Sequence, residues 1–175
     1  MATNKALRQG PERGGETIEF ALVSLVFLTL VFGMLEFGRM LYLYNTMQEV
    51  TRRAAREAVT RWVDQGATVK SLALFGASSV PAGPEITSAN ITITYWTKSP
   101  SAQVDPMPAD PGDNIVACSD VTRAASCIDS VQVSIDGVKY APMTPLFGIL
   151  NIDGRLDMPK STVRMHAESL GFNNE

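Results

Sequence analysis

The feature that most constrains this chain is a charge-free apolar stretch near its N-terminus. Residues 20–35 are 16 consecutive uncharged residues, most of them Leu, Val or Phe. At about 1.5 Å per residue they would form about 24 Å of helix, shorter than the roughly 30 Å hydrocarbon core of a bilayer. Residues 18–44 would give roughly 40 Å, because the long side chain of Arg39 can carry its charge toward the membrane surface. The sequence therefore predicts a membrane-spanning helix.

Two other interpretations fit this stretch less well. A cleaved secretory signal has a shorter apolar core and a small-residue cleavage site, whereas this stretch leads into Glu36. A core helix of a soluble protein would show a polar face, but only Ser24, Thr29 and Gly33 interrupt the apolar surface. Glu36 and Arg39 are three residues apart, so we expect them to be able to pair within the membrane segment. A retained single-pass anchor is the favoured interpretation.

The helix is predicted to continue beyond the membrane. Apolar residues recur at steps of three and four along one stripe, at Met47, Val50, Ala54, Ala58 and Trp62. Gly66 is a suitable residue to follow the end of a helix. We therefore expect one helix from about residue 16 to residue 64.

The C-terminal half has the pattern of a small β-rich domain. Residues 91–96 alternate between apolar and polar side chains and are the clearest strand. Further strands are predicted within residues 129–140, where Val131, Val133 and Ile135 share a face, and at 154–158 and 161–166, which would form a hairpin. The segments 76–90 and 99–114 are rich in Pro, Gly or Asp and predict connections. The expected fold class is α+β, with the long helix packed on a small antiparallel sheet.

Two cysteines lie in this half. Cys118 and Cys127 are too few for a zinc site, because His166 is the single histidine of the chain. A disulfide between them is the more economical interpretation if this half lies in an oxidising compartment. On the loop-entropy model, it would stabilise the domain by roughly 2–3 kcal/mol.

Composition argues against several classes of function. The chain has 15 basic and 18 acidic residues, so it lacks the overall basic charge expected of a nucleic-acid-binding protein. It contains no G-x-S-x-G, phosphate-binding loop or paired-histidine motif, and we expect no catalytic residues, no metal and no cofactor. The sequence indicates a protein that acts by assembly rather than as an enzyme.

A short motif at the start of the apolar stretch resembles a type IV prepilin processing site. Residues 14–20 read GGETIEF, after a polar leader that carries Lys5, Arg8 and Arg13. Transferred residue by residue, the resemblance makes Gly14 the last leader residue, Gly15 the new N-terminus and Glu19 the fifth mature residue. Cleavage after Gly15 is the alternative, and it would make Glu19 the fourth.

A longer segment is similar to the TadE-like proteins, pseudopilins of the tight-adherence (Flp) pilus system. The similarity is carried by EFAL at 19–22, GMLEFGR at 33–39 and AAREA at 54–58. It implies a pilin-like organisation: a cytoplasmic leader (1–14), a transmembrane helix (15–44), a periplasmic helix continuation (45–66) and a periplasmic β-rich head (67–175). The implied location is the bacterial inner membrane, with entry into a surface pilus as an option.

The resemblance also implies partners. A prepilin peptidase would remove the leader, and other pilins, pseudopilins and the pilus assembly machinery would then engage the mature chain. The carboxylate of Glu19 would pair with the N-terminal amine of a neighbouring subunit. The expected function is a minor pilin in surface attachment and biofilm formation. The alternative is an unprocessed, single-pass membrane-anchored periplasmic protein that acts as a binding protein or sensor.

Overall fold

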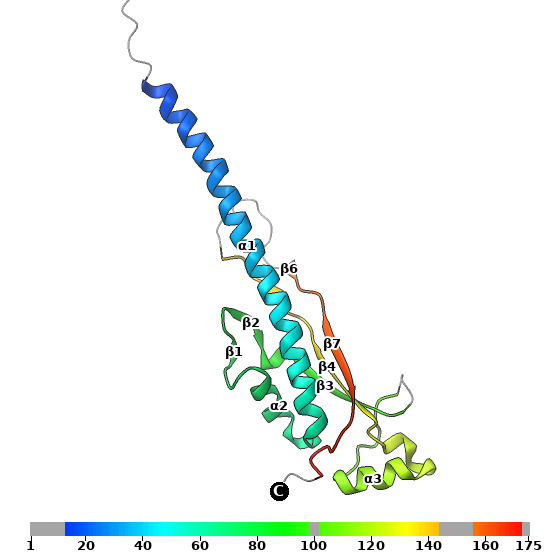
Figure 1. The fold of residues 1–175 in the computed structure, drawn as a ribbon. Coiled ribbons are helices and arrows are strands. Elements are labelled where there is room, and N and C mark those ends of the chain that lie inside the picture. Colours follow the sequence, from blue (N-terminus) through cyan, green and yellow to red (C-terminus); the bar gives the residue numbers. More distant parts are fainter. Residues whose placement is uncertain (1–12, 99–101, 144–155, 173–175) are drawn as a thin grey trace, which may run out of the picture.

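One long helix organises the molecule. The structure, a computed structural model, describes residues 13–98, 102–143 and 156–172. Helix α1 (Arg13–Thr60) has 48 residues, and its N-terminal half projects away from the rest of the chain while its C-terminal half packs on the head (Figure 1). The head is built from short helices and small antiparallel sheets. The predicted α+β class, a helix packed on a small sheet head, is confirmed.

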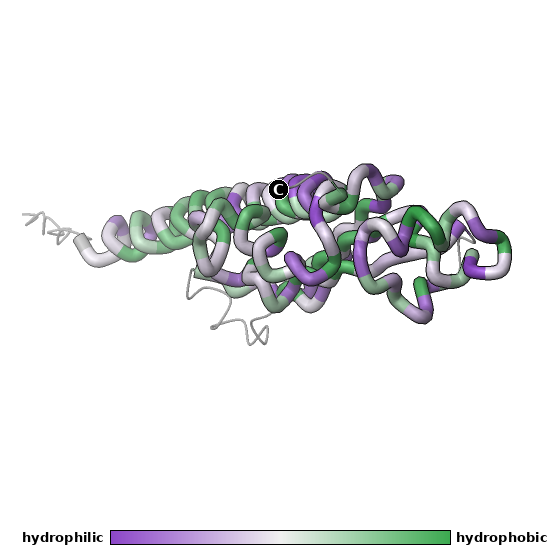
Figure 2. Tube along the Cα trace, turned by 90° about the horizontal axis from the view of Figure 1, so that it is seen from below, coloured by the Kyte–Doolittle hydropathy of each residue, from purple (hydrophilic) through white to green (hydrophobic). Residues whose placement is uncertain are grey.

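The surface of α1 changes at the point where the helix meets the head: exposed apolar residues lie before this point, and buried residues begin there. Figure 2 shows hydrophobic residues along the projecting half of the helix. The first α1 residue to be buried is Glu36, and Leu43 and Met47 follow on the same side. The predicted stripe forms the contact with the head, where Val50, Ala54 and other α1 residues are almost fully buried.

Helix α1 ends earlier than predicted. It ends at Thr60, and Gly66, expected to lie beyond the end of α1, instead begins α2 (Gly66–Ala73) in the right-handed helical conformation. The backbone N–H groups of Glu168 and Leu170 donate to the carbonyl oxygen of Val59, at 3.2 Å each. The segment at 168–170 thus provides the hydrogen-bond donors for a carbonyl group at the end of α1. From the sequence alone, water or a local cap would be the expected partner of this carbonyl.

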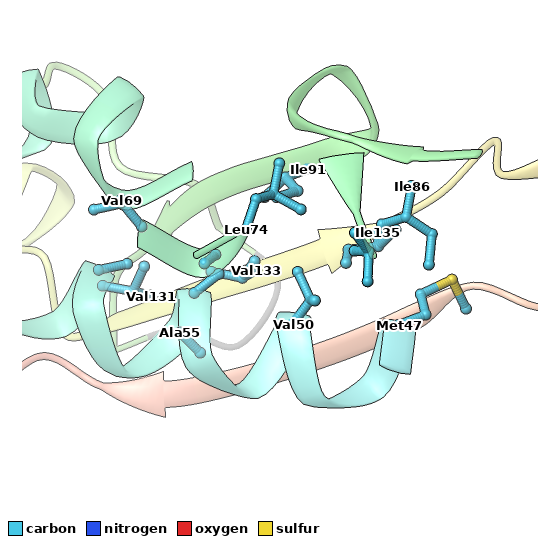
Figure 3. Packing of buried hydrophobic residues seen from close by; sticks show 14 of the residues in the cluster. Met47, Val50, Ala55, Val69, Leu74, Ile86, Ile91, Val131, Val133 and Ile135 are labelled. Atoms are coloured by element: carbon cyan, nitrogen blue, oxygen red, sulfur yellow. The ribbon is translucent and has the colours of Figure 1, made fainter. Parts of the chain in front are cut away.

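The main sheet lies under the C-terminal half of α1. It has three antiparallel strands in the order β3 (Ile91–Trp96), β4 (Ser130–Ile135), β7 (Ser161–His166). On β4, Val131, Val133 and Ile135 are fully buried, as their alternation predicts. Figure 3 shows these side chains and those of α1 in one core, with Val69 and Leu74 from the α2 region closing it on another side.

The predicted hairpin of residues 154–158 and 161–166 is wrong. Strand β6 (Leu156–Asp157) pairs with β5 (Lys139–Tyr140), whereas β7 pairs with β4. The backbone N–H of Met158 donates to the carbonyl oxygen of Val138, at 2.9 Å. Strands β6 and β7 thus pair with two successive strands, β5 and β4, that lie earlier in the chain. This long-range pairing takes the place of the local hairpin. Residues 154 and 155 lie outside the described part.

The predicted connection at residues 76–90 is more ordered than expected. It contains a small two-stranded sheet, β1 (Ser79–Val80) and β2 (Gly83–Thr87), and the 3-10 helix η2 (Ser88–Asn90). Gly83 lies directly against α1, because a Cβ atom at this position would be 2.5 Å from Cδ2 of Leu43. This close approach explains why a glycine stands there.

Part of the predicted loop at 99–114 is helical. Helix α3 (Pro111–Ser119) begins inside it, with Asp110 as the N-cap accepting from the backbone N–H of Asp113 at 2.8 Å. The Asp-Pro pair is a common start of a helix, so this signal was present in the sequence. A 3-10 helix, η3 (Val121–Ser126), follows. A further 3-10 helix of three residues, η1 (Val63–Gln65), precedes α2.

The predicted disulfide joins Cys118 in α3 to Cys127 after η3. Beside it, Asn114 accepts from the backbone N–H of Ile128 at 2.8 Å. Arg123 donates to Asp113 at 2.7 Å and holds the pKa of that carboxyl below its usual range. Residues 110–127 therefore form a lobe closed by one covalent link and a few polar contacts.

Replacing Cys118 and Cys127 together by serine is expected to lower the free energy of unfolding by about 2–3 kcal/mol, because the unfolded chain regains the entropy of a short loop. Thermal unfolding of the full chain in detergent micelles, followed by circular dichroism, measures this. Wild-type protein under reducing conditions should match the double variant. An unchanged midpoint would show that the lobe is held by its other contacts.

Candidate functional site: the projecting helix and its junction with the head

The projecting half of α1 is an exposed apolar surface. Most of its large side chains, including Ile18, Phe20, Leu25 and Phe27, are more than half exposed. Within the described residues, α1 is the one helix long and apolar enough to cross a membrane. In water this surface would be unfavourable, since burial of apolar area is the main favourable term in folding. The chain therefore has a helix suited to membrane anchoring.

The predicted processing site lies on the first turn of α1. Gly14 and Gly15 are exposed, and a Cβ atom added at either position would meet no atom within 4 Å. Nothing in the fold of this chain therefore requires glycine there. Glu19 is exposed one turn later and forms no ion pair with a described residue. Its carboxylate is available to a group from outside the chain.

The predicted pair of Glu36 and Arg39 belongs to a polar cluster between α1 and the head. Glu36 is only 5% exposed, although it directly follows the exposed apolar stretch. Its carboxylate accepts a short hydrogen bond from the Tyr140 hydroxyl and a second, at 2.9 Å, from the backbone N–H of Met143. Burial raises the pKa of Tyr140 to about 12, and the Glu36 carboxylate adds to this shift, so the phenol remains a donor at neutral pH.

Arg39 links the same region to β2. Its Nη2 donates to Oε1 of Glu85 at 2.5 Å, and its Nη1 donates to the carbonyl oxygen of Ala141 at 2.8 Å. The guanidinium also lies over the Tyr140 ring, 5.0 Å from its centroid. Glu36 is farther away, with 4.0 Å between Nη1 and Oε1. The predicted partner is thus a secondary one, and Glu85 is the main partner of Arg39.

We call Glu36, Arg39, Glu85 and Tyr140 the junction cluster. It contains two buried carboxylates and one guanidinium, so its formal charge is −1. Two of its buried polar atoms, Nε of Arg39 and Oε2 of Glu85, have no hydrogen-bond partner in the described part of the chain. Such atoms usually have partners in folded proteins, because an unpaired buried polar group is costly. No sequence pattern pointed to Glu85 or Tyr140, which lie 46 and 104 residues from the helix residues they contact.

The structure keeps the two predicted sites of α1 apart. Glu19 and Glu36 are 17 residues apart on a continuous helix, or about 26 Å. The first lies in the exposed apolar region, and the second lies against the head. Among the described residues, no group of three or more His, Cys, Asp or Glu side chains is arranged to hold a metal ion. His166 is exposed on β7, with its ring 3.6 Å from Asp129.

One family of known proteins matches most of helix α1. The model of the family described as TadE-like protein matches residues 14–56, which confirms the resemblance read from the sequence. The match covers about a quarter of the chain: it begins at Gly14 and contains Glu19, Glu36 and Arg39. No curated protein and no solved structure matches this chain.

Proposed function

We propose that this chain, whose N-terminal helix matches the TadE-like family, is a minor pilin or pseudopilin of a tight-adherence (Flp) pilus. The observation that carries the proposal is the division of α1 into an exposed apolar half with Glu19 near its start and a half packed on the head. The helix would hold the chain in the inner membrane, with the N-terminus cytoplasmic and the head periplasmic. Its role in surface attachment and biofilm formation would come from assembly, without catalysis.

The junction cluster supports a shorter membrane segment than residues 15–44. Residues 15–35 would form a helix of about 32 Å, which matches the roughly 30 Å hydrocarbon core. The next residue, Glu36, is buried against the head together with Arg39. The head therefore shields both charges where the helix leaves the hydrocarbon, and Arg39 need not extend toward the membrane surface.

Processing at Gly14 would complete the assembly site. Cleavage between Gly14 and Gly15 would create an α-amine that is positive at neutral pH. Charges are costly in the bilayer, roughly 2.5–3.5 kcal/mol at its centre, so a carboxylate and an amine from neighbouring subunits gain by pairing. This pairing of Glu19 would set the register between subunits. A prepilin peptidase, other pilins and the pilus assembly machinery are the partners that this reaction sequence requires.

Mass spectrometry of the mature N-terminus tests the proposal. Protein purified from cells with an active prepilin peptidase is expected to begin at Gly15. Gly14→Val should leave the chain uncleaved but still inserted, because a side chain at position 14 meets nothing in the fold. Gly15→Val is the matched control, and it should still be cleaved after Gly14. A wild-type chain with an intact leader would instead support the unprocessed membrane-anchored alternative.

A further inference from the structure

A pocket of about 360 Å³ opens on the surface of the head, between α1 and the segments that carry α2 and β1. Its floor contains Val50 of α1 and Val80 of β1, which are almost fully buried. Its rim contains Tyr42 of α1, Phe75 after α2 and Pro81 after β1. Figure 1 shows α2 and β1 beside the part of α1 that lies on the head. An exposed pocket lined mainly by apolar side chains is typical of a surface that binds a partner.

Phe75 is held at the rim of this pocket in a strained conformation. Its φ is +58°, in the left-handed region that bulky residues rarely adopt and that glycine usually occupies after a helix. Its side chain is nevertheless 59% exposed, with the guanidinium carbon of Arg53 4.2 Å from the ring centroid. Burial of the ring within the described part of the chain therefore does little to offset the strain. Backbone strain of this kind is found where a side chain is held in place for a partner.

Two opposite charges flank the pocket on α1. Glu49 is exposed and lies on the rim, and Arg53 lies one turn farther along the helix, beside Phe75. They are four residues apart, but neither forms an ion pair with the other or with another described residue. A partner that carries the same two groups could pair its arginine with Glu49 and its glutamate with Arg53. The charges of this surface are therefore complementary to those of a second copy.

The height of the pocket above the membrane restricts the partner. Tyr42 and Val50 lie about 10 and 22 Å along the helix from Leu35, the last residue of the charge-free stretch. A partner must present an apolar side chain at this height, outside the hydrocarbon. A second copy anchored by the same helix presents Phe75 there, because Phe75 itself lines the pocket. A two-fold axis along the membrane normal would relate two such copies and keep their heights equal.

We propose that this surface joins two copies of the chain into a two-fold dimer in the membrane. We call it the Phe75 face, and it consists of Tyr42, Glu49, Arg53, Phe75 and Pro81. Phe75 of each copy enters the pocket of the other, and Glu49 of each copy pairs with Arg53 of the other. The ring thereby gains the burial that it lacks in the single chain. The inference rests on the membrane anchoring in the proposed function, and adds a second copy as a specific partner.

Fluorescence energy transfer in lipid vesicles tests the dimer. Full chains labelled at the C-terminus with a donor or an acceptor dye are reconstituted together, and energy transfer is measured as the protein is diluted with lipid. Wild-type chains are expected to follow a monomer–dimer equilibrium. Phe75→Gly should weaken association at least about tenfold, because two rings lose their pockets at once. The variant should remain folded, since glycine adopts a positive φ without strain.

Phe172→Ala is the matched control for the loss of a ring. Phe172 is 54% exposed and does not line the pocket, so this variant should associate as the wild type does. A pair of charge variants separates the interface from effects on folding. Glu49→Arg and Arg53→Glu should each associate about fivefold more weakly than the wild type, because like charges then face each other across the axis. An equal mixture of the two should recover wild-type association, since every facing pair is then opposite in charge.

The possible contrary results separate the dimer from the proposed function. Wild-type chains that insert but show only the transfer of random proximity at every density would exclude a second copy as the occupant, and would leave the proposed function standing. Wild-type association in Phe75→Gly, or no recovery in the mixture of charge variants, would show that the Phe75 face is not the interface. Failure of the wild-type chain to insert into vesicles would contradict the membrane anchoring itself, and the dimer with it.

Discussion

Replacing Arg39 by methionine is expected to destabilise the packing of α1 on the head by about 3 kcal/mol. Methionine keeps most of the apolar stem, so the main change is loss of the guanidinium. Glu85 would then remain buried without the guanidinium that pairs with it, and removal of one partner from a buried ion pair costs roughly 3–5 kcal/mol. We expect the lower end of this range, because the Arg39 side chain is 16% exposed.

Thermal unfolding of the full chain in micelles, followed by near-ultraviolet circular dichroism, measures the effect. Arg61→Met is the matched control: Arg61 pairs with Glu57 at 3.1 Å, but their side chains are 30% and 32% exposed. An exposed pair of this kind contributes about 0.5 kcal/mol or less. Adding Glu85→Gln to Arg39→Met should restore part of the lost stability, because it removes one stranded charge. Equal losses in the two arginine variants would show that the junction cluster acts only as a surface pair.

Replacing Glu19 by alanine is expected to reduce incorporation into the fibre at least tenfold. On the proposed mechanism, the variant leaves the amine of a neighbouring subunit without a partner in the bilayer, at a cost of roughly 2.5–3.5 kcal/mol. Processing and membrane insertion should be normal, because Glu19 contacts no described charged group and its helix is otherwise apolar.

The amount of the chain in sheared fibres, divided by the amount in the membrane fraction, measures incorporation. Glu16→Ala is the matched control, since Glu16 is also exposed and lies one turn earlier, nearer the membrane surface. It should incorporate normally. Normal incorporation of Glu19→Ala would exclude a role of this carboxylate in assembly, even if the chain is processed at Gly14.

Local patterns predicted those parts of the fold that local physics decides. Sixteen charge-free residues require a helix in an apolar environment, because lipid offers no partner for backbone polar groups. Strict alternation around Val133 places one face of β4 in the core. The spacing of Cys118 and Cys127 permits closure of a short loop. In each case the deciding interactions lie within a few residues in sequence.

The wrong predictions share a different cause. Strands β6 and β7 look like a local hairpin, but their hydrogen-bonding partners are β5 and β4. The end of α1 is set at Thr60, where Val59 accepts from residues more than a hundred positions later. Strand pairing and the end of α1 depend on which strand edges and hydrogen-bond donors from distant parts of the sequence come close when the chain folds. Turn residues and hydrophobic periodicity carry no information about these long-range contacts.

The sequence by itself determined that this chain has an apolar N-terminal helix, a carboxylate near the start of that helix, and a small β-rich head. Only the tertiary structure decided where the exposed apolar part ends. Glu36 and Arg39 read as charges within a membrane segment, yet Glu85, Tyr140 and the backbone around β5 surround them. The physical reason is that a buried charge needs partners, and here those partners come from segments far away in sequence.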